Sequence, residues 1–255
     1  MFIIFAPNQI LQTYKKFDDF PMETLSKIWY FNQPVKSKQR EVGLLIEHRI
    51  RYGLSGNCFD LALWLLDEFS KNKIHAYPVA NDLFTTDAHV AVVVLDEDGF
   101  RYLCDLGDQW IQPILIDSIH PSYSEDAFSN FFPAAKVQVK RMEKRLRVYY
   151  HRSNGKFSTQ NYDLTPISME VFLKGAEFSQ QHISRKPLFE KRIPYKEETA
   201  HWEFYNWKSF LSTSEGLMNE KKRNNTKEWA EVIARIANAD INFIDQALEM
   251  YKRSY

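Results

Sequence analysis

The chain has 255 residues, and its 33 lysines and arginines are balanced by 33 aspartates and glutamates, so its formal net charge at pH 7 is zero. Hydrophobic residues make up 44% of the sequence and aromatic residues 15%, which supports a buried core and excludes global disorder. The balanced charge argues against a dedicated nucleic-acid-binding protein, because such proteins normally carry a basic excess. No window of about 18 apolar residues occurs, so we expect no membrane-spanning helix.

The cysteine count and the start of the chain bear on where the protein works. Cys58 and Cys104 stand alone, which excludes a disulfide framework and a zinc site built from CxxC pairs. Five histidines show no HExxH or similar ligand spacing, so we expect no metal; they are His75, His120, His151, His182 and His201. The apolar start, residues 1–6, is too short for a signal peptide and has no basic region before it. We therefore expect a cytoplasmic protein with free thiols.

The first third of the chain has the pattern of helices. Apolar side chains recur at helical spacing in residues 21–31 and 35–50, and a turn-forming stretch follows at residues 53–57. The next run, Phe59–Phe69, is apolar nearly all round, which is typical of a helix in the middle of its domain. Cys58 lies in the expected first turn of that helix.

From Ile74 onward the spacing changes to that of strands. Two short runs rich in β-branched and aromatic residues flank Asp96–Gly99, which is a strong hairpin signal. Further strands are expected at residues 136–150, 156–164, 187–195 and 201–210, a helix at 168–182, and two helices within 226–253 that are divided near 238–240. This order predicts an α+β protein rather than alternating βαβ units.

Cys58 is the first candidate for chemistry. It opens a helix, where the first backbone N–H groups have no partner within the helix and the macrodipole places partial positive charge. That environment is expected to lower the pKa of a thiol below its ordinary value of about 8.5. The same N–H groups could stabilise an oxyanion on a bound acyl group.

His89 and Asp105 are the second and third candidates. His89 opens the most hydrophobic run of the chain, and Asp105 ends the next predicted strand. If these strands pair across the turn between them, they run antiparallel and bring the imidazole beside the carboxylate. The roles would then be Cys58 as nucleophile, His89 as base, and Asp105 as the group that fixes the imidazole tautomer.

Each of these residues also has a structural interpretation. An isolated cysteine at a helix start, or a histidine leading into a buried strand, is more often part of a core than of an active site. Cys104 should point to the opposite face of its strand from Asp105, so we expect a core thiol there. The basic stretch at residues 136–147 is typical of a solvated strand face, although it could also hold the phosphates of coenzyme A or an acidic carrier protein.

Three blocks of the sequence resemble arylamine N-acetyltransferases. SGNCFDLALWLL resembles the family's nucleophile block, which commonly reads R-G-G-x-C-F/Y-E, and DAHVAVVV resembles its histidine strand. YLCDLGDQWIQP resembles the family's Y-x-x-D-V-G-F-G block. The order and separation of Cys58, His89 and Asp105 also fit, and the resemblance spans residues 25–213.

The resemblance implies a papain-like or transglutaminase-like core. A helical domain at residues 1–73 would carry the cysteine, an antiparallel β-barrel at 74–165 would carry the histidine and aspartate, and an α/β lid at 166–255 would include the C-terminal helices. Acetyl-coenzyme A, or another acyl thioester, would acylate Cys58 as a co-substrate, with no permanently bound cofactor. The acyl group would then pass to a small amine by a ping-pong mechanism.

The chain departs from the family pattern at two places. Leu54-Ser55-Gly56 stands where Arg-Gly-Gly is usual, and Gly107-Asp108-Gln109 stands where Gly-Phe-Gly is usual. Three alternatives therefore stay open. These are an acyltransferase that depends on an acyl carrier protein, a transglutaminase-like cysteine hydrolase or peptidase, and a catalytically inactive binding module of the same fold.

Overall fold

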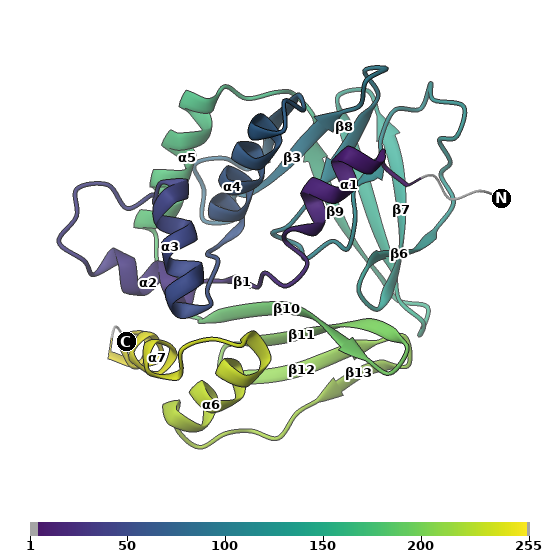
Figure 1. Ribbon diagram of the computed structural model, residues 1–255. Helices are drawn as coiled ribbons and strands as arrows, with labels where there is room; N and C mark the ends of the chain where they lie inside the picture. Colours follow the sequence, from purple (N-terminus) through teal and green to yellow (C-terminus); the bar gives the residue numbers. More distant parts are fainter. Residues whose placement is uncertain (1–4, 254–255) are drawn as a thin grey trace.

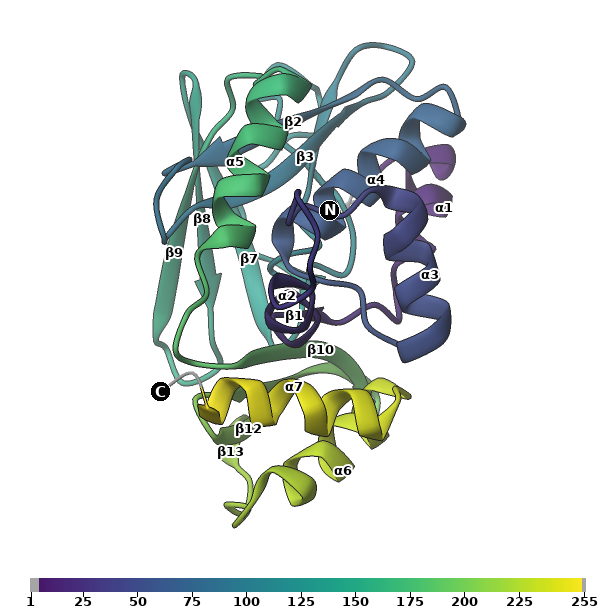
Figure 2. The same cartoon turned by 90° about the vertical axis from the view of Figure 1, so that its left-hand side faces the viewer.

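A computed structural model describes residues 5–253, which contain three antiparallel sheets, one group of helices in the upper part of the molecule and a separate pair of helices at the bottom (Figures 1 and 2). The helices are α1 (Asn8–Lys15), α2 (Leu25–Phe31), α3 (Val42–Tyr52), α4 (Cys58–Lys71), α5 (Met169–Gln181), α6 (Thr226–Ala237) and α7 (Ile241–Arg253). Within residues 5–253, no helix combines the length and apolarity that a membrane crossing requires. The prediction of a mixed α+β fold is confirmed.

Two of the sheets occupy the middle of the chain. The first has the order β2 (Ala76–Asn81), β3 (His89–Leu95), β4 (Arg101–Cys104) and β5 (Ile114–Leu115). The second has the order β6 (Phe128–Phe132), β7 (Ala135–Met142), β8 (Arg145–His151) and β9 (Phe157–Asp163). These strands form two open sheets, so the expected antiparallel barrel is not confirmed in the part of the chain that the structure describes.

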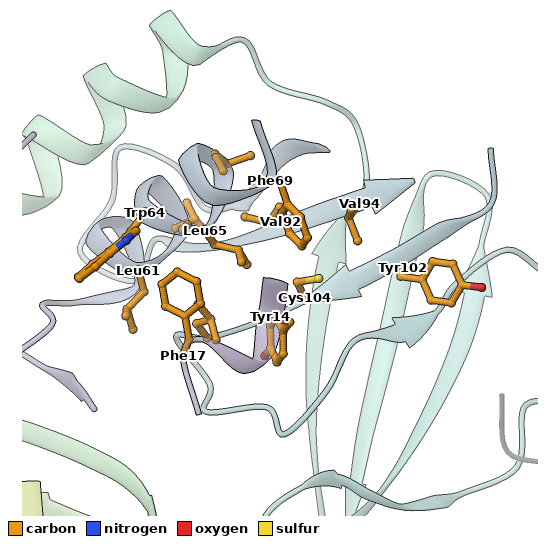
Figure 3. Packing of buried hydrophobic residues seen from close by; sticks show 14 of the residues in the cluster. Tyr14, Phe17, Leu61, Trp64, Leu65, Phe69, Val92, Val94, Tyr102 and Cys104 are labelled. Atoms are coloured by element: carbon orange, nitrogen blue, oxygen red, sulfur yellow. The ribbon is translucent and has the colours of Figure 1, made fainter. Parts of the chain in front are cut away.

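Strand β3 is covered on both faces, which explains why its sequence is apolar throughout. Val90, Val92 and Val94 pack with α1 and α4, and Figure 3 shows two of these valines beside helix residues and Cys104. Ala91 and Val93, on the opposite face, pack against the second sheet. The first sheet is therefore a central layer between helices and strands, and this buried position fixes its register.

The third sheet lies below these layers in Figure 1 and has the order β1 (Met22–Glu23), β10 (Leu188–Tyr195), β11 (Glu198–Tyr205), β12 (Lys208–Thr213) and β13 (Gly216–Asn219). One face packs on α6 and α7, with Phe204 against Trp229. The opposite face carries Arg192, which donates to the carbonyl of Trp110 in the loop after β4. The two C-terminal helices cover the face of this sheet that is turned away from that loop, and their assignment to a lid stays a prediction.

Several expected elements differ from those observed. Met22–Glu23, expected to be helical, is a short strand that pairs with β10, and the following helix begins only at Leu25. The expected strand at 201–210 is broken by Asn206 and Trp207, whose φ angles of 48° and 63° make a tight hairpin turn. Helix α1 was not predicted, and the first residues of the apolar start, 1–4, lie outside the described residues.

The C-terminal helices are divided as predicted. Asn238 ends α6 in the left-handed conformation, with φ 53°, and α7 begins three residues later. The expected hairpin is also confirmed, because β3 and β4 pair antiparallel with Val92 opposite Cys104 and Leu95 opposite Arg101. The division of the chain into units 1–73, 74–165 and 166–255 stays a prediction.

Candidate active site

Cys58 is the first residue of α4, and its position is fixed by a capping box. The Asn57 side chain accepts hydrogen bonds from the amides of Phe59 and Asp60, and the Asp60 carboxylate accepts one from the Asn57 amide. The cap therefore engages two of the first-turn amides that we expected to be available to stabilise an oxyanion. The amide of Cys58 itself is not used by this cap.

A buried ion pair supports the turn before Cys58. Arg40 and Asp60 have side-chain exposures of 1% and 0%, and their charged atoms lie 2.7 Å apart. Arg40 also donates to Nδ1 of His48 at 3.2 Å, and burial together with the Arg40 charge lowers the pKa of His48 to about 4. The Arg40 guanidinium lies against Gly56, where an added Cβ would meet it at 2.6 Å. The guanidinium of Arg40 therefore lies beside this turn. Leu54 occupies the position where the resemblance predicts an arginine.

His89 and Asp105 form a direct contact. The His89 Nε2–H donates to Oδ2 of Asp105 at 2.6 Å. The Cys58 side chain lies beside the same imidazole, because Cβ of Cys58 and Cε1 of His89 are 2.6 Å and 3.1 Å from the point that a Cβ on Gly107 would occupy. Cys58 and His89 are both partly exposed, whereas Asp105 is fully buried. The structure therefore brings the three candidate side chains into one line of contacts, with the cysteine and histidine at the accessible end.

Gly107 allows this close approach. A Cβ placed on Gly107 would lie 2.6 Å from Cβ of Cys58, 3.1 Å from Cε1 of His89 and 3.2 Å from Oδ1 of Asp105. A carbon atom does not fit at 2.6 Å from another carbon, so any larger residue would displace the cysteine or the loop. The glycine of the loop after β4 is therefore required by space rather than by a positive φ.

Asp105 is held by donors that the sequence did not identify. Its Oδ2 accepts from the Tyr162 hydroxyl at 2.7 Å, and its Oδ1 accepts from the Asp108 amide at 2.8 Å. Burial and the charge of Asp105 keep the pKa of Tyr162 well above its ordinary value, so the phenol stays a donor. Asp105 is thus fixed from two sides in addition to its contact with His89.

The charge state of His89 follows from its neighbours. Burial acts to lower the pKa of His89, but the carboxylates of Asp105 and Asp108 and the hydrogen bonds to Asp105 and Cys58 outweigh it. The pKa of His89 is therefore held well above its ordinary value. A raised pKa favours the protonated imidazole, and the neighbouring carboxylates stabilise that cation.

Asp108 adds a second acid beside the imidazole. Its Oδ2 accepts from the Tyr150 hydroxyl at 2.8 Å. Burial, followed by the charge of Asp105, raises the pKa of Asp108 to about 7, while His89 acts in the opposite direction. Potential ligand atoms of His89, Asp105 and Asp108 lie within 4.8 Å of one another. Because Nε2 of His89 and both oxygens of Asp105 are used in hydrogen bonds, this group is a hydrogen-bonded network rather than a vacant set of metal ligands.

A cavity of about 780 Å³ lies between the second and third sheets. Its lining includes Phe132, Lys136, His151 and Arg152. The Phe132 ring also contacts the ring of Tyr150, with 4.7 Å between centroids, and Tyr150 in turn binds Asp108. One aromatic pair therefore connects the wall of the cavity to the cluster around His89.

The remaining sequence candidates are placed as follows. Cys104 is 1% exposed and belongs to the apolar cluster with α1 and α4, so it is the expected core thiol, and burial raises its pKa (Figure 3). In the basic stretch, Lys136 and Arg145 are exposed, while Val137 and Leu146, their neighbours in sequence, are buried. That alternation is the solvated strand face that the sequence favoured.

The chain is a mixed α+β protein whose helical layer and three antiparallel sheets are arranged as in known acyltransferase structures. Its fold is that of the arylamine N-acetyltransferases. The enzyme from Salmonella typhimurium matches with a TM-score of 0.72 and 11% identity, over 100% of this chain and 94% of that one. The Mycobacterium tuberculosis enzyme matches with a TM-score of 0.70 and 12% identity, over 98% and 95%.

A third match is the Mycobacterium marinum arylamine N-acetyltransferase in complex with CoA, with a TM-score of 0.70 and 10% identity, over 97% of this chain and 93% of that one. No protein-family model and no curated protein sequence matches the chain. At these low identities, the similarity establishes a shared fold along nearly the full length.

Proposed function

We propose that the protein is a divergent acyltransferase of the arylamine N-acetyltransferase type. In this proposal Cys58 is the acylated nucleophile, His89 the general base and Asp105 the residue that orients the imidazole. The observation that supports it most strongly is the set of contacts from Cys58 through His89 to Asp105 at the start of a buried helix. The same fold in solved arylamine N-acetyltransferases is the second support.

In the first half-reaction we take Cys58 as a thiolate and His89 as an imidazolium. The Cys58 thiolate attacks the carbonyl carbon of an acyl thioester, and the amide of Cys58 is placed to donate to the oxyanion. Collapse of the tetrahedral intermediate expels the donor thiolate, which takes the proton from the His89 imidazolium. The enzyme then carries an acyl thioester on Cys58 and a neutral imidazole on His89.

The second half-reaction restores the starting state. A neutral amine attacks the thioester carbonyl, and His89 takes a proton from the attacking nitrogen. Asp105 stabilises the imidazolium that forms, and Tyr162 keeps the carboxylate oriented. The amide product leaves, and the thiolate–imidazolium pair of Cys58 and His89 is regenerated.

We further propose that the donor is an acyl-coenzyme A and that the acceptor is a small amine. The M. marinum enzyme of this fold is described in complex with CoA. In this chain, the cavity between the sheets presents Lys136, His151 and Arg152, which can pair with phosphates. No resident cofactor is needed for these steps. We also propose a cytoplasmic location, because a reducing compartment keeps the Cys58 thiol free.

Mass spectrometry of the intact protein after incubation with acetyl-coenzyme A tests this function. We expect one added acetyl group, which peptide mapping assigns to Cys58, and loss of that group when an amine is added. The Cys104→Ala variant is the matched control and should still be acetylated, whereas Cys58→Ala should not. Absence of an adduct with any acyl-coenzyme A would contradict acyl transfer. Release of free acid without an amide product would also contradict it and would support a hydrolase.

A further inference from the structure

The candidate active site contains a carboxylate that the first half-reaction does not use, that of Asp108. The Asp108 backbone amide binds Asp105, and its carboxylate binds Tyr150, so two hydrogen bonds hold it beside His89. The side chain is only half-buried, which leaves it within reach of a ligand. A carboxylate oxygen of Asp108 lies within 4.8 Å of a His89 ring nitrogen. A molecule bound next to His89 therefore lies close to Asp108 as well.

Further acids lie on the third sheet. Glu190 on β10 acts on Asp108 from the third sheet, and Glu203 stands directly opposite Glu190 on β11. Burial and the charge of Glu190 raise the pKa of Glu203 to about 7, while His201 and Arg152 act in the opposite direction.

Cationic groups oppose these acids. His201 is 8% exposed, and its Nε2 pairs with Glu190 at 3.4 Å. Although burial acts to lower the pKa of His201, the hydrogen bond and charge of Glu190 raise it. Besides Asp105, the other titratable groups facing Asp108 are His89, which carries the opposite charge, and Tyr150, which donates a hydrogen bond. Asp108 is therefore a partly exposed carboxylate next to His89, and such a group fits a ligand that donates protons.

We propose that Asp108 selects an aliphatic primary amine by binding its ammonium form and accepting one proton from it. This inference rests on the proposed acyl transfer through Cys58 and names the class of acceptor. An arylamine is mostly neutral at pH 7 and gains nothing from a carboxylate, whereas an alkylammonium gains a charge-assisted hydrogen bond. The position where the resemblance predicts an aromatic residue thus carries the group that a cationic acceptor needs.

The protons of the step balance. The alkylammonium gives one proton to the Asp108 carboxylate and becomes a neutral amine. That amine attacks the acyl carbon on Cys58, and its second proton passes to His89 as the carbon–nitrogen bond forms and the carbon–sulfur bond breaks. The thiolate–imidazolium pair is restored, and Asp108 releases its proton to solvent.

The test compares two acceptors on one preloaded enzyme. Cys58 is acetylated with p-nitrophenyl acetate, which carries no coenzyme A, and aminolysis is followed with putrescine and with p-anisidine. We expect Asp108→Asn to lower the ratio of the putrescine rate to the p-anisidine rate by about ten- to a hundredfold, the value of a charge-assisted hydrogen bond. The ratio removes any effect of the substitution on His89 that both acceptors share.

Two further variants serve as controls for this test. Asp108→Glu retains the charge and should recover most of the ratio, and Asp98→Asn, in the exposed turn between β3 and β4, should leave it unchanged. In the wild type, the putrescine rate should rise with pH through about 7, the pKa of Asp108.

The outcomes separate this inference from the proposed function. Normal acetylation of Cys58 with an unchanged ratio in Asp108→Asn overturns the role of Asp108 alone. An enzyme that takes no acetyl group from either acetyl-coenzyme A or p-nitrophenyl acetate overturns both proposals.

Discussion

Tyr162 donates its phenolic proton to the same Asp105 oxygen that receives the His89 ring proton, at 2.7 Å and 2.6 Å respectively. The carboxylate is therefore held by strand β9 as well as by the imidazole. This arrangement fixes the direction in which Asp105 faces His89. It also shares the negative charge of Asp105 between two donors.

The Tyr162→Phe variant removes one of these donors without changing the volume of the ring. We expect the free energy of unfolding to fall by about 1.5–3 kcal/mol, the value of a hydrogen bond to a charged group. Since less of the Asp105 charge is then satisfied, the pKa of His89 should rise further, and the basic limb of the pH–rate profile should move to higher pH. Denaturant melts and a pH series of Cys58 acetylation measure the two effects. Tyr149→Phe, on the outer face of β8, is the control, and an equal shift in that variant would contradict the role given to Tyr162.

The Gly107→Ala variant tests the close contact between the loop after β4 and Cys58. The new methyl group would overlap Cβ of Cys58, so we expect a loss of about 1–3 kcal/mol in stability from overpacking. Displacement of the sulfur from His89 by about 1 Å should lower the acetylation rate by about a hundredfold.

Gly43→Ala is the matched control for Gly107→Ala. Gly43 is an exposed position in α3 with nothing within 4 Å of the new carbon. It should raise stability by about 0.5–1 kcal/mol and leave the rate unchanged. A Gly107→Ala variant with normal acetylation would show that the loop tolerates the side chain and that the contact is not critical.

The Arg40→Met variant tests the buried ion pair below the start of α4. Removal of the guanidinium leaves the buried Asp60 carboxylate without its cation, so we expect a loss of about 3–5 kcal/mol in the free energy of unfolding. Lys16→Ala breaks an exposed ion pair with Glu68 and should cost less than about 1 kcal/mol. Urea denaturation of both variants makes the comparison, and similar small losses would mean that Arg40 does not support the turn.

Local pattern was sufficient to predict the part of the site that lies on one hairpin. The strands β3 and β4 are close in sequence, and the Asp96–Gly99 turn sets their pairing, so the approach of His89 to Asp105 followed from the sequence. The buried helix after Cys58 followed from its apolar run. In both cases the relevant partners are separated by few residues or by one turn.

The supporting residues could not be predicted in this way. Tyr162 is separated from Asp105 by 57 positions and Arg40 from Asp60 by 20, and neither pair belongs to one local motif. Their contacts depend on how sheets and helices pack, which no periodicity records. The same limit explains why a closed barrel was expected, since closure depends on strand tilt and register across the whole sheet.

The cavity between the second and third sheets, which we propose as the site for the coenzyme A phosphates, gives a prediction that separates coenzyme A from smaller donors. Arg152→Ala and Lys136→Ala remove cations from its wall, so the KM for acetyl-coenzyme A should rise by about tenfold if one charge-assisted contact to phosphate is lost. The KM for p-nitrophenyl acetate, which has no phosphate, should stay the same. Steady-state kinetics with both donors provide the measurement. Equal changes for the two donors would place the coenzyme elsewhere.

The raised pKa of Asp108 predicts a substitution that stabilises the fold while impairing the acceptor step. In the unfolded chain this carboxyl has its ordinary pKa of about 3.9, and in the folded protein burial and the Asp105 charge raise it to about 7. A carboxyl group whose pKa is higher in the folded than in the unfolded chain contributes stability below pH 4. That contribution is lost as the pH rises through 7. Asp108→Asn should therefore change stability little at pH 4 and increase it at pH 8. The expected gain is on the order of 1–4 kcal/mol, because one pKa unit corresponds to about 1.4 kcal/mol.

Glu68→Gln provides the opposite sign as a control for the Asp108 experiment. Although burial acts against it, hydrogen bonds from Lys16 and Lys71 lower the pKa of Glu68, so its charged form stabilises the fold. That variant should lose stability at pH 8, by less than about 1 kcal/mol for an exposed pair, and the loss should vanish in acid. Thermal melts of both variants from pH 4 to pH 8 give two curves of opposite slope relative to the wild type. An Asp108→Asn protein that is less stable than the wild type at pH 8 would show that the charged carboxylate is a structural contact and not a strained group kept for binding an ammonium.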